Sequence, residues 1–278
     1  MPLIDLGDHH VNVRQWGEGE PLLLVHGLGT DSDVWRGQIP ALSRRYRVLA
    51  IDLRGFGRST VPPGPLSFTF DAVVDDIVAL CRKLDLAPIH YVGTSMGGFL
   101  GQALVLREPD LCRTLSLCFT AAHMAIPADV LTSRLEALRQ MSMDDYGALI
   151  ARQALAQPAD PIVEEALSEM IAKNDRDIYV HFLAKVLNGF DVTERVGTIR
   201  IPTLILSGSD DRIIPPERGA ELHAMIAGSE FRLIEGVGHI GYAERADVVT
   251  NHILDFLERQ ASHQTRAGTA TVAANSNA

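Results

Sequence analysis

Short runs of apolar residues recur along the chain, and each run ends at a glycine, an aspartate or a turn. Five of them, four or five residues long, are almost wholly apolar: residues 22–25, 47–51, 89–92, 115–119 and 203–206. Strands buried on both faces have this pattern, and they are typical of parallel sheets. Residues 11–16 alternate more and carry charge, so we expect an antiparallel strand at the sheet edge.

Helical patterns lie between these runs. Apolar residues in the segment 70–84 recur with a period of about 3.6 residues, which predicts a helix with one face on the core. A second helix is expected over residues 99–107, ending ahead of Pro109. Because strands alternate with helices, the sequence predicts an α/β fold, with a parallel sheet covered by helices on both faces.

The alternation is interrupted over residues 124–190, where helical segments follow one another without a strand. One apolar stripe consists of Leu131, Leu135, Leu138 and Met141. Asp160 followed by Pro161 is a typical helix start, and Asp175 can cap a further helix that ends before Gly189. We therefore expect a helical cap, residues 124–190, inserted into a core formed by residues 1–123 and 191–260. Residues 261–278 show no apolar period and are predicted to be a disordered tail.

Composition and charge narrow the class of protein. Hydrophobic residues make up 46% and charged residues 22% of the 278 positions, which is ordinary for a globular chain. With 25 Lys and Arg against 35 Asp and Glu, the net charge is −10, so nucleic acid and anionic membranes are not expected partners. Residues 1–15 lack a secretory pattern, and no apolar stretch reaches the length of about 18 residues that a membrane span needs. We expect a cytoplasmic protein.

The three cysteines have no paired spacing. Cys81, Cys112 and Cys118 are an odd number in a large chain, and none belongs to a Cys-x-x-Cys pair. They are interpreted as reduced thiols in the core, which excludes a disulfide framework or a zinc site built from cysteines.

The strongest chemical signal is Gly93-Thr94-Ser95-Met96-Gly97, which follows the strand 89–92 and precedes a helix that begins near Gly98. In a Gly-x-Ser-x-Gly turn the serine sits on a tight, strained bend, and the glycines leave space for neighbouring backbone. The start of the next helix offers unpaired N–H groups to a developing oxyanion. The pentapeptide alone could be a chance turn, but its place between strand and helix favours a nucleophilic serine.

A serine hydroxyl needs a base, and the base needs a carboxylate that orients it. Among ten histidines, His239 stands out, since it lies in a glycine-rich loop after the short strand 231–234. Ligands of open α/β sheets bind at such strand ends. For His123 and His181, in or near the insertion, packing is the favoured role and a place in the pocket the alternative. Two adjacent aspartates after the strand 203–206, Asp210 and Asp211, compete for the role of the carboxylate.

Taken together, these motifs resemble those of the α/β-hydrolase family with a helical cap. The resemblance covers residues 8–260 and is carried by five segments in order: His26-Gly27-Leu28-Gly29, residues 52–59, 93–97 and 208–215, and Gly238-His239. It implies the α/β-hydrolase fold, with a mostly parallel eight-stranded sheet. It also selects Asp211 as the acid of a Ser95–Asp211–His239 triad, and the backbone N–H groups of Leu28 and Met96 as oxyanion donors.

Some branches of the family are excluded by the nucleophile. Epoxide hydrolases and haloalkane dehalogenases of this fold use an aspartate where this chain has Ser95. Residues 28–30, 95–98, 101–102 and 120–122 are similar to 3-oxoadipate enol-lactonases and related carboxylesterases, although His26-Gly27 departs from typical members of that branch. The C–C bond hydrolases usually have a Gly-Pro-Gly oxyanion loop, which Gly29-Thr30-Asp31 lacks.

The resemblance therefore implies a carboxylic ester hydrolase, an esterase or lactonase that forms an acyl-serine intermediate and needs no metal or cofactor. A C–C bond hydrolase and a cofactor-free perhydrolase or haloperoxidase would use the same triad and stay open. A non-enzymatic small-molecule receptor on this scaffold is a different class.

The roof of the substrate pocket is expected to come from the insertion. Met124, Met141 and Phe182 are candidates to line an apolar pocket, with plain packing as the competing interpretation. The expected partner is a small-molecule ester or lactone, and the sequence leaves a homo-oligomer open.

Overall fold

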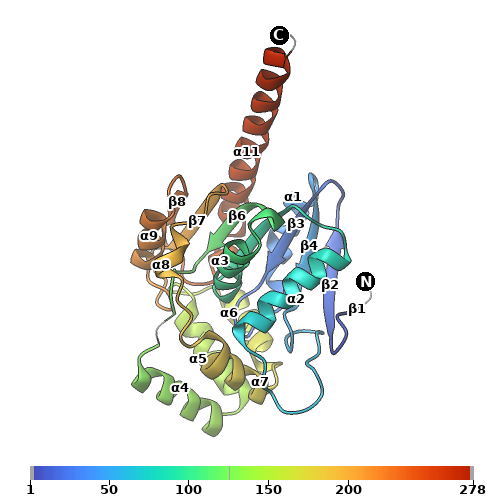
Figure 1. Ribbon diagram of the computed structural model, residues 1–278. Coiled ribbons are helices and arrows are strands. Elements are labelled where there is room, and N and C mark those ends of the chain that lie inside the picture. Colours follow the sequence, from blue (N-terminus) through green and yellow to red (C-terminus); the bar gives the residue numbers. More distant parts are fainter. Residues whose placement is uncertain (1–2, 125, 276–278) are drawn as a thin grey trace.

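An eight-stranded sheet forms the centre of the protein (Figure 1). The computed structural model describes residues 3–124 and 126–275. The strands are β1 (Leu3–Asp5), β2 (His10–Trp16), β3 (Glu20–Val25), β4 (Tyr46–Ile51), β5 (Ile89–Thr94), β6 (Cys112–Cys118), β7 (Thr203–Gly208) and β8 (Glu230–Ile234). They are arranged in the order β1-β2-β4-β3-β5-β6-β7-β8, antiparallel where β2 is a partner and parallel elsewhere. The predicted α/β class and mostly parallel sheet are confirmed.

Strand β3 shows why the apolar runs are continuous. Leu22 and Leu24 pack into one hydrophobic core, whereas Leu23 and Val25 pack into a second core on the opposite face. Successive side chains of a strand point to opposite faces, so a strand covered on both sides needs apolar residues at every position.

One prediction about the sheet edge is wrong. Strand β2 is antiparallel, as expected from its alternation, but β1 pairs with it on the outer side, with Leu3 opposite Asn12 and Asp5 opposite His10. With only three residues, Leu3–Asp5 is too short to show a periodic pattern, and its outward position leaves Leu3 exposed.

Helices cover both faces of the sheet, as the sequence predicts. On one face lie α2 (Phe70–Lys83), α3 (Met96–Arg107), α8 (Thr193–Val196) and α9 (Pro216–Met225). On the other face lie the 3₁₀ helix η1 (Ser32–Gly37), α1 (Ile39–Leu42), α10 (Gly241–Glu244) and α11 (Ala246–Asn275). A short 3₁₀ turn, η2 (Pro109–Leu111), leads from α3 into β6.

The segment between β6 and β7 is helical over most of its length, and we refer to residues 124–190 as the cap segment. Its elements are α4 (Ala128–Gln140), α5 (Met143–Ala154), α6 (Pro161–Ala172), α7 (Arg176–His181) and a π-helical turn, η3 (Phe182–Leu187). Asp160 and Asp175 cap α6 and α7 through side-chain hydrogen bonds, as their sequence positions predict. These helices gather at one end of the sheet (Figure 1).

The C-terminal helix differs from its prediction. Residues 261–278 are expected to be disordered, but α11 continues as helix to Asn275, and residues 276–278 lie outside the described part. The stretch up to Asn275 contains no proline, and alanine, which has the highest helix propensity, recurs in it. The hydrogen bonding that begins in the packed part of α11 therefore propagates. No helix within residues 3–124 and 126–275 is long and apolar enough to cross a membrane.

Candidate active site

Ser95 lies on the turn between β5 and α3, with φ at 51° and ψ at −115°. A positive φ is strained for a residue other than glycine, and the surrounding structure must hold it. The Ser95 N–H donates to the carbonyl of Cys118 at 2.9 Å, and the Thr120 hydroxyl donates to the carbonyl of Ser95 at 3.0 Å. A Cβ on Gly97 would lie 2.3 Å from the carbonyl oxygen of Val25, so the turn packs too closely for a side chain there.

His239 and Asp211 come from the loops after β8 and β7, and their side chains are buried against each other. The distance from His239 Nδ1 to Asp211 Oδ2 is 2.8 Å. Because a carboxylate only accepts, Nδ1 carries the proton and Nε2 is free to accept one. The other oxygen, Oδ1, accepts the N–H groups of Ile213 and Ile214, both at 2.8 Å. Asp210 is exposed, so the structure brings Asp211 to the histidine.

The loop after β3 passes directly over Ser95. A Cβ on Gly27 would lie 3.2 Å from Ser95 Cβ, so the loop packs against the serine, and the next residue, Leu28, lines the same pocket as Ser95. His26 fixes this loop, since its Nε2 accepts the Leu53 N–H at 2.9 Å and its Nδ1 donates to the Gly27 carbonyl at 2.7 Å. Burial lowers the pKa of His26, which keeps the ring neutral and able to make both bonds.

Two backbone amides in the loops around Ser95 have no acceptor in the part of the chain that the structure describes. Within the described residues, the N–H groups of Leu28 and Met96 make no hydrogen bond. Met96 is the first residue of α3, where helical N–H groups have no partner inside the helix. Buried amides are nearly always paired, so these two donors are available to an oxygen atom of a bound molecule.

Asp52 fixes the start of the segment 52–59 through three hydrogen bonds. Its Oδ1 accepts the Ser32 N–H at 2.8 Å, and its Oδ2 accepts the Arg58 N–H at 2.9 Å and the Asn12 amide at 2.8 Å. Burial alone would raise the pKa of Asp52. The hydrogen bonds from Arg58 and Ser32 lower it by more than burial raises it, so the pKa lies below its usual value. Asp52 does not line the pocket that contains Ser95.

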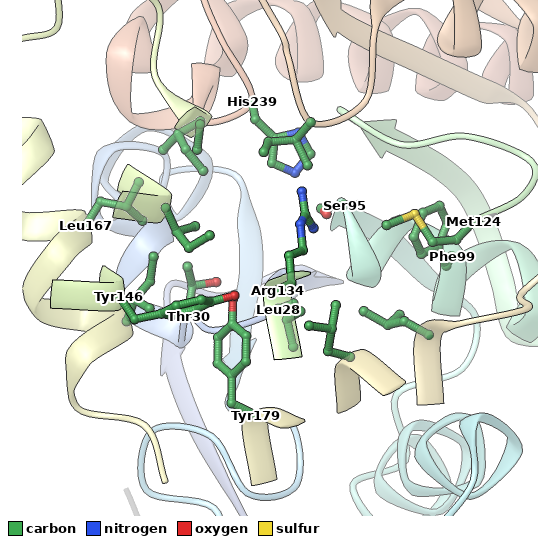
Figure 2. Close-up of a pocket in the computed structure, with 17 residues that line it drawn as sticks. Leu28, Thr30, Ser95, Phe99, Met124, Arg134, Tyr146, Leu167, Tyr179 and His239 are labelled. Carbon is green, nitrogen blue, oxygen red and sulfur yellow. The ribbon is translucent and has the colours of Figure 1, made fainter. Parts of the chain in front are cut away.

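Ser95 and His239 line one pocket between the sheet and the cap segment (Figure 2). The pocket has an empty volume of about 690 Å³, part of it open to solvent, and most of its lining is apolar. The lining residues are Leu28, Thr30, Ser95, Phe99, Met124, Arg134, Tyr146, Ile150, Ala154, Leu167, Ile171, Tyr179, Leu183, Leu187, Ile213, His239 and Ile240. Met124 lines the pocket as expected.

The other two predicted pocket residues lie elsewhere. Phe182 is fully buried against Phe56 and Phe68, with ring centroids 4.7 and 5.2 Å away, so it joins the cap segment to the core. Met141 ends α4, and its carbonyl accepts a hydrogen bond from Arg176 at 2.9 Å. An apolar period shows which side of a helix is buried, but the neighbour that buries each residue depends on the tertiary structure.

Neither histidine of uncertain role lines the pocket. His123 accepts a hydrogen bond from the Arg218 guanidinium, and His181 donates to the carbonyl of Phe68 at 2.8 Å. Both therefore have the packing role that the sequence favours.

Four polar residues that line the pocket were not assigned to it from the sequence: Thr30, Arg134, Tyr146 and Tyr179. The two tyrosine rings meet edge to face, with centroids 5.5 Å apart. Burial raises the pKa of both phenols, so they stay protonated. A signal for Arg134 was present, because it lies three residues after Leu131 on the apolar face of α4, where a charge is unusual.

Glu244 joins the His239 loop to the cap segment. Its Oε2 accepts the N–H of Gly238 at 2.9 Å, and its Oε1 accepts the N–H of Ala156 at 2.8 Å. The N–H of His239 donates directly to the carbonyl of Ala154 at 2.6 Å. Burial raises the pKa of Glu244, although the two hydrogen bonds partly offset this effect. The histidine loop is thus held from the sheet side and from the cap side.

The residues described contain no cluster of three His, Cys, Asp or Glu side chains that could hold a metal ion. The three cysteines are buried and make no disulfide. Burial raises the pKa of the Cys81 and Cys118 thiols to about 12, and that of Cys112 also upward, so they are poor nucleophiles at neutral pH.

Comparison with known proteins gives consistent similarities. The family described as alpha/beta hydrolase fold matches residues 20–157. A protein of Agrobacterium fabrum, provisionally named carbamate hydrolase RutD, is 30% identical over 257 residues, which cover 89% of this chain and 96% of that protein. The 2-hydroxy-6-oxononadienedioate/2-hydroxy-6-oxononatrienedioate hydrolase of Escherichia coli K12 is 28% identical over 265 residues, 90% of this chain and 91% of that protein.

Among solved structures, the enol-lactonase from Burkholderia xenovorans LB400 superposes with a TM-score of 0.85 at 30% sequence identity. The superposition covers 92% of this chain and 100% of the enol-lactonase chain.

Proposed function

The chain belongs to the α/β-hydrolase family, and we propose that it is a serine hydrolase that cleaves carboxylic esters or lactones through an acyl-serine intermediate. The observation that carries this proposal is the buried hydrogen bond between His239 and Asp211. His239 lines the same pocket as Ser95, whose backbone is strained. A hydroxyl, an imidazole and a carboxylate in these positions have the roles of nucleophile, base and orienting acid.

The proposed reaction has two halves. His239 Nε2 takes the Ser95 proton while Oγ attacks the carbonyl carbon, and Asp211 stabilises the imidazolium that forms. The N–H groups of Leu28 and Met96 bind the oxyanion of the tetrahedral intermediate. When the intermediate collapses, the C–O bond breaks and the departing alcohol oxygen takes the proton from His239. Water then attacks the acyl-serine, His239 takes a proton from that water, and the acid is released as Ser95 regains its proton.

The apolar lining supports a substrate of modest size whose reacting carbonyl lies at the polar end of the pocket. The similarity to an enol-lactonase supports a lactone or ester, and the carbamate named for the Agrobacterium fabrum relative is a related carbonyl substrate. A C–C bond hydrolase is the second candidate, favoured by the similarity to the Escherichia coli enzyme. Gly29-Thr30-Asp31 weighs against it, because that class usually has Gly-Pro-Gly in the oxyanion loop.

The test is turnover of 4-nitrophenyl acetate and butyrate by the wild type, Ser95→Ala, His239→Ala and the double variant. Each single change should reduce kcat by several orders of magnitude, and the double variant should be little worse, because residues of one triad act as a unit. A fluorophosphonate probe should label the wild type and leave Ser95→Ala unlabelled. Thermal melts show whether the variants are folded.

Losses that multiply in the double variant would show that Ser95 and His239 do not share one mechanism. A protein that stops after a few turnovers would be a receptor. A carbamate and 2-hydroxy-6-oxononadienedioate, the compounds named for the two relatives, complete the panel and distinguish the bond that is cleaved.

A further inference from the structure

Arg134 carries the permanent positive charge of the pocket. It enters from α4, whereas the rest of the lining consists of apolar side chains, three hydroxyl-bearing ones besides Ser95, and His239. No aspartate or glutamate of the described chain lines this pocket. A guanidinium stays charged at any pH the protein meets, so the pocket holds a cation without an anion.

The charge has no anionic partner among the described residues. Within the described residues, Arg134 forms no ion pair and no hydrogen bond, although the chain has 35 acidic residues. Two other arginines of the cap segment have partners: Arg152 pairs with Glu164 at 3.0 Å, and Arg176 donates to the Met141 carbonyl. Arg139 has no side-chain partner among the described residues, but it is exposed, so water solvates its charge. Partial burial of a charge without a partner costs free energy, so a helix gains nothing in stability from an arginine on this face.

The position of Arg134 points its charge at the reacting end of the pocket. In Figure 2 its side chain extends from the cap segment toward the end where Ser95 and His239 lie. Its charge also acts on the buried phenols of Tyr146 and Tyr179. Burial raises the pKa of both phenols, and the positive charge of Arg134 partly offsets this rise. Thr30 and these two hydroxyls are further hydrogen-bonding groups on the wall of the same pocket.

We infer that Arg134 binds a carboxylate group of the substrate, so that the pocket selects esters or lactones that carry a carboxylate in addition to the bond that is cleaved. This inference rests on the proposed function, because the reacting carbonyl is taken to lie at Ser95. A guanidinium can give a carboxylate two parallel hydrogen bonds, which fixes both its position and its orientation. The anion that Arg134 lacks within the protein is then supplied by the substrate.

The experiment compares two pairs of esters. The first pair places the charge on the acyl side: 4-nitrophenyl hydrogen glutarate against the neutral 4-nitrophenyl pentanoate. The second places it on the alcohol side: 4-acetoxybenzoate against the neutral 4-methylphenyl acetate. For each pair the measured quantity is the ratio of kcat/KM for the anionic ester to kcat/KM for the neutral ester, in the wild type and in each variant. Intrinsic differences in reactivity cancel when this ratio is compared between proteins.

Arg134→Gln and Arg134→Met should reduce the ratio in at least one pair by about tenfold to a hundredfold, as the loss of a charge-assisted hydrogen bond predicts. The loss should appear chiefly as a higher KM, while the neutral ester changes less than about threefold. Arg134→Lys should retain part of the preference. The matched control is Arg139→Gln, the same change at an exposed position of the same helix, which should leave the ratio unchanged.

If the ratio is the same in the wild type, Arg134→Gln and Arg134→Met for both pairs of esters, the inference is overturned. The proposed ester hydrolase function would still stand. An equal decrease with Arg139→Gln would also overturn it, because a general effect of charge would then be responsible. If the wild type hydrolyses none of the four esters and the fluorophosphonate probe does not react, the proposed function fails, and the inference fails with it.

Discussion

Glu244 and Gly238 are joined by a hydrogen bond of 2.9 Å in which the carboxylate accepts the backbone N–H of the residue before His239. The second oxygen of the same carboxylate accepts the N–H of Ala156 in the cap segment at 2.8 Å. One side chain outside the pocket lining therefore positions the histidine loop and ties the cap segment to it.

Glu244→Ala should leave both amides without an acceptor. Each buried donor left unpaired costs about 1–3 kcal/mol, so the melting temperature should fall. The freed loop should also misplace His239 and reduce kcat about tenfold or more, with KM less affected. Glu235→Ala, at an exposed position just before the same loop, is the control and should change neither quantity. Unchanged kcat in a destabilised Glu244→Ala protein would limit Glu244 to a structural role.

The two adjacent aspartates should differ sharply in kinetics. Asp211→Asn keeps the shape of the side chain but favours the wrong imidazole tautomer, and kcat should fall on the order of 10⁴-fold, by analogy with the serine-protease triad. Asp210 is exposed, so Asp210→Asn should change the rate by less than about tenfold. Steady-state kinetics on one ester suffice. The reverse ranking would contradict the hydrogen-bonding arrangement described for Asp211.

Met124 and Phe182 should separate specificity from stability. Met124 lines the pocket, so Met124→Ala should shift the preference among acetyl, butyryl and octanoyl esters, with about 1–3 kcal/mol of discrimination per methylene. Phe182 is buried among Phe56 and Phe68, so Phe182→Ala should lower stability by about 3–5 kcal/mol and leave the preference unmoved. Kinetics on the three esters beside a urea melt test both. A preference altered by Phe182→Ala alone would reverse the assignment.

Asp52 should contribute stability that depends on pH. Its pKa is lowered in the folded protein, so the contribution is complete above the unfolded value, near 3.8, and is lost as the pH falls through the folded value. Asp52→Asn should therefore be less stable than the wild type by about 1–3 kcal/mol at pH 7. The difference should persist to about pH 5 and narrow below about pH 4. Urea melts across this range are the measurement, and exposed Asp110→Asn is the control. A difference that grows toward acid would contradict the sign.

The sheet could be predicted because its signals are local. A run such as residues 22–25 is apolar at every position only if both faces are covered, and the structure covers both. Ser95 and His239 could be selected because each follows a strand and lies among glycines, and parallel strands bring their ends to one edge. From the residues alone, Asp210 and Asp211 were equal candidates, and only the family pattern and then the fold distinguished them.

The pocket could not be predicted in the same way, because it depends on contacts between distant segments. Met124, Met141 and Phe182 were equal candidates from the sequence, yet only the packing of the cap segment on the core determines which side chain meets empty space. The sequence around Glu244 contains no motif that would predict its role. Its partners, Gly238 and Ala156, come from two parts of the chain that meet only after folding.

Helix α11 determines how the protein can be attached to a solid support. It projects from the sheet at the end opposite α4 and α7 (Figure 1). A tether joined to this helix would hold the molecule by the end farthest from the cap segment. Immobilised in that orientation, the protein would have its pocket facing the solution that contains the substrate and not the solid support.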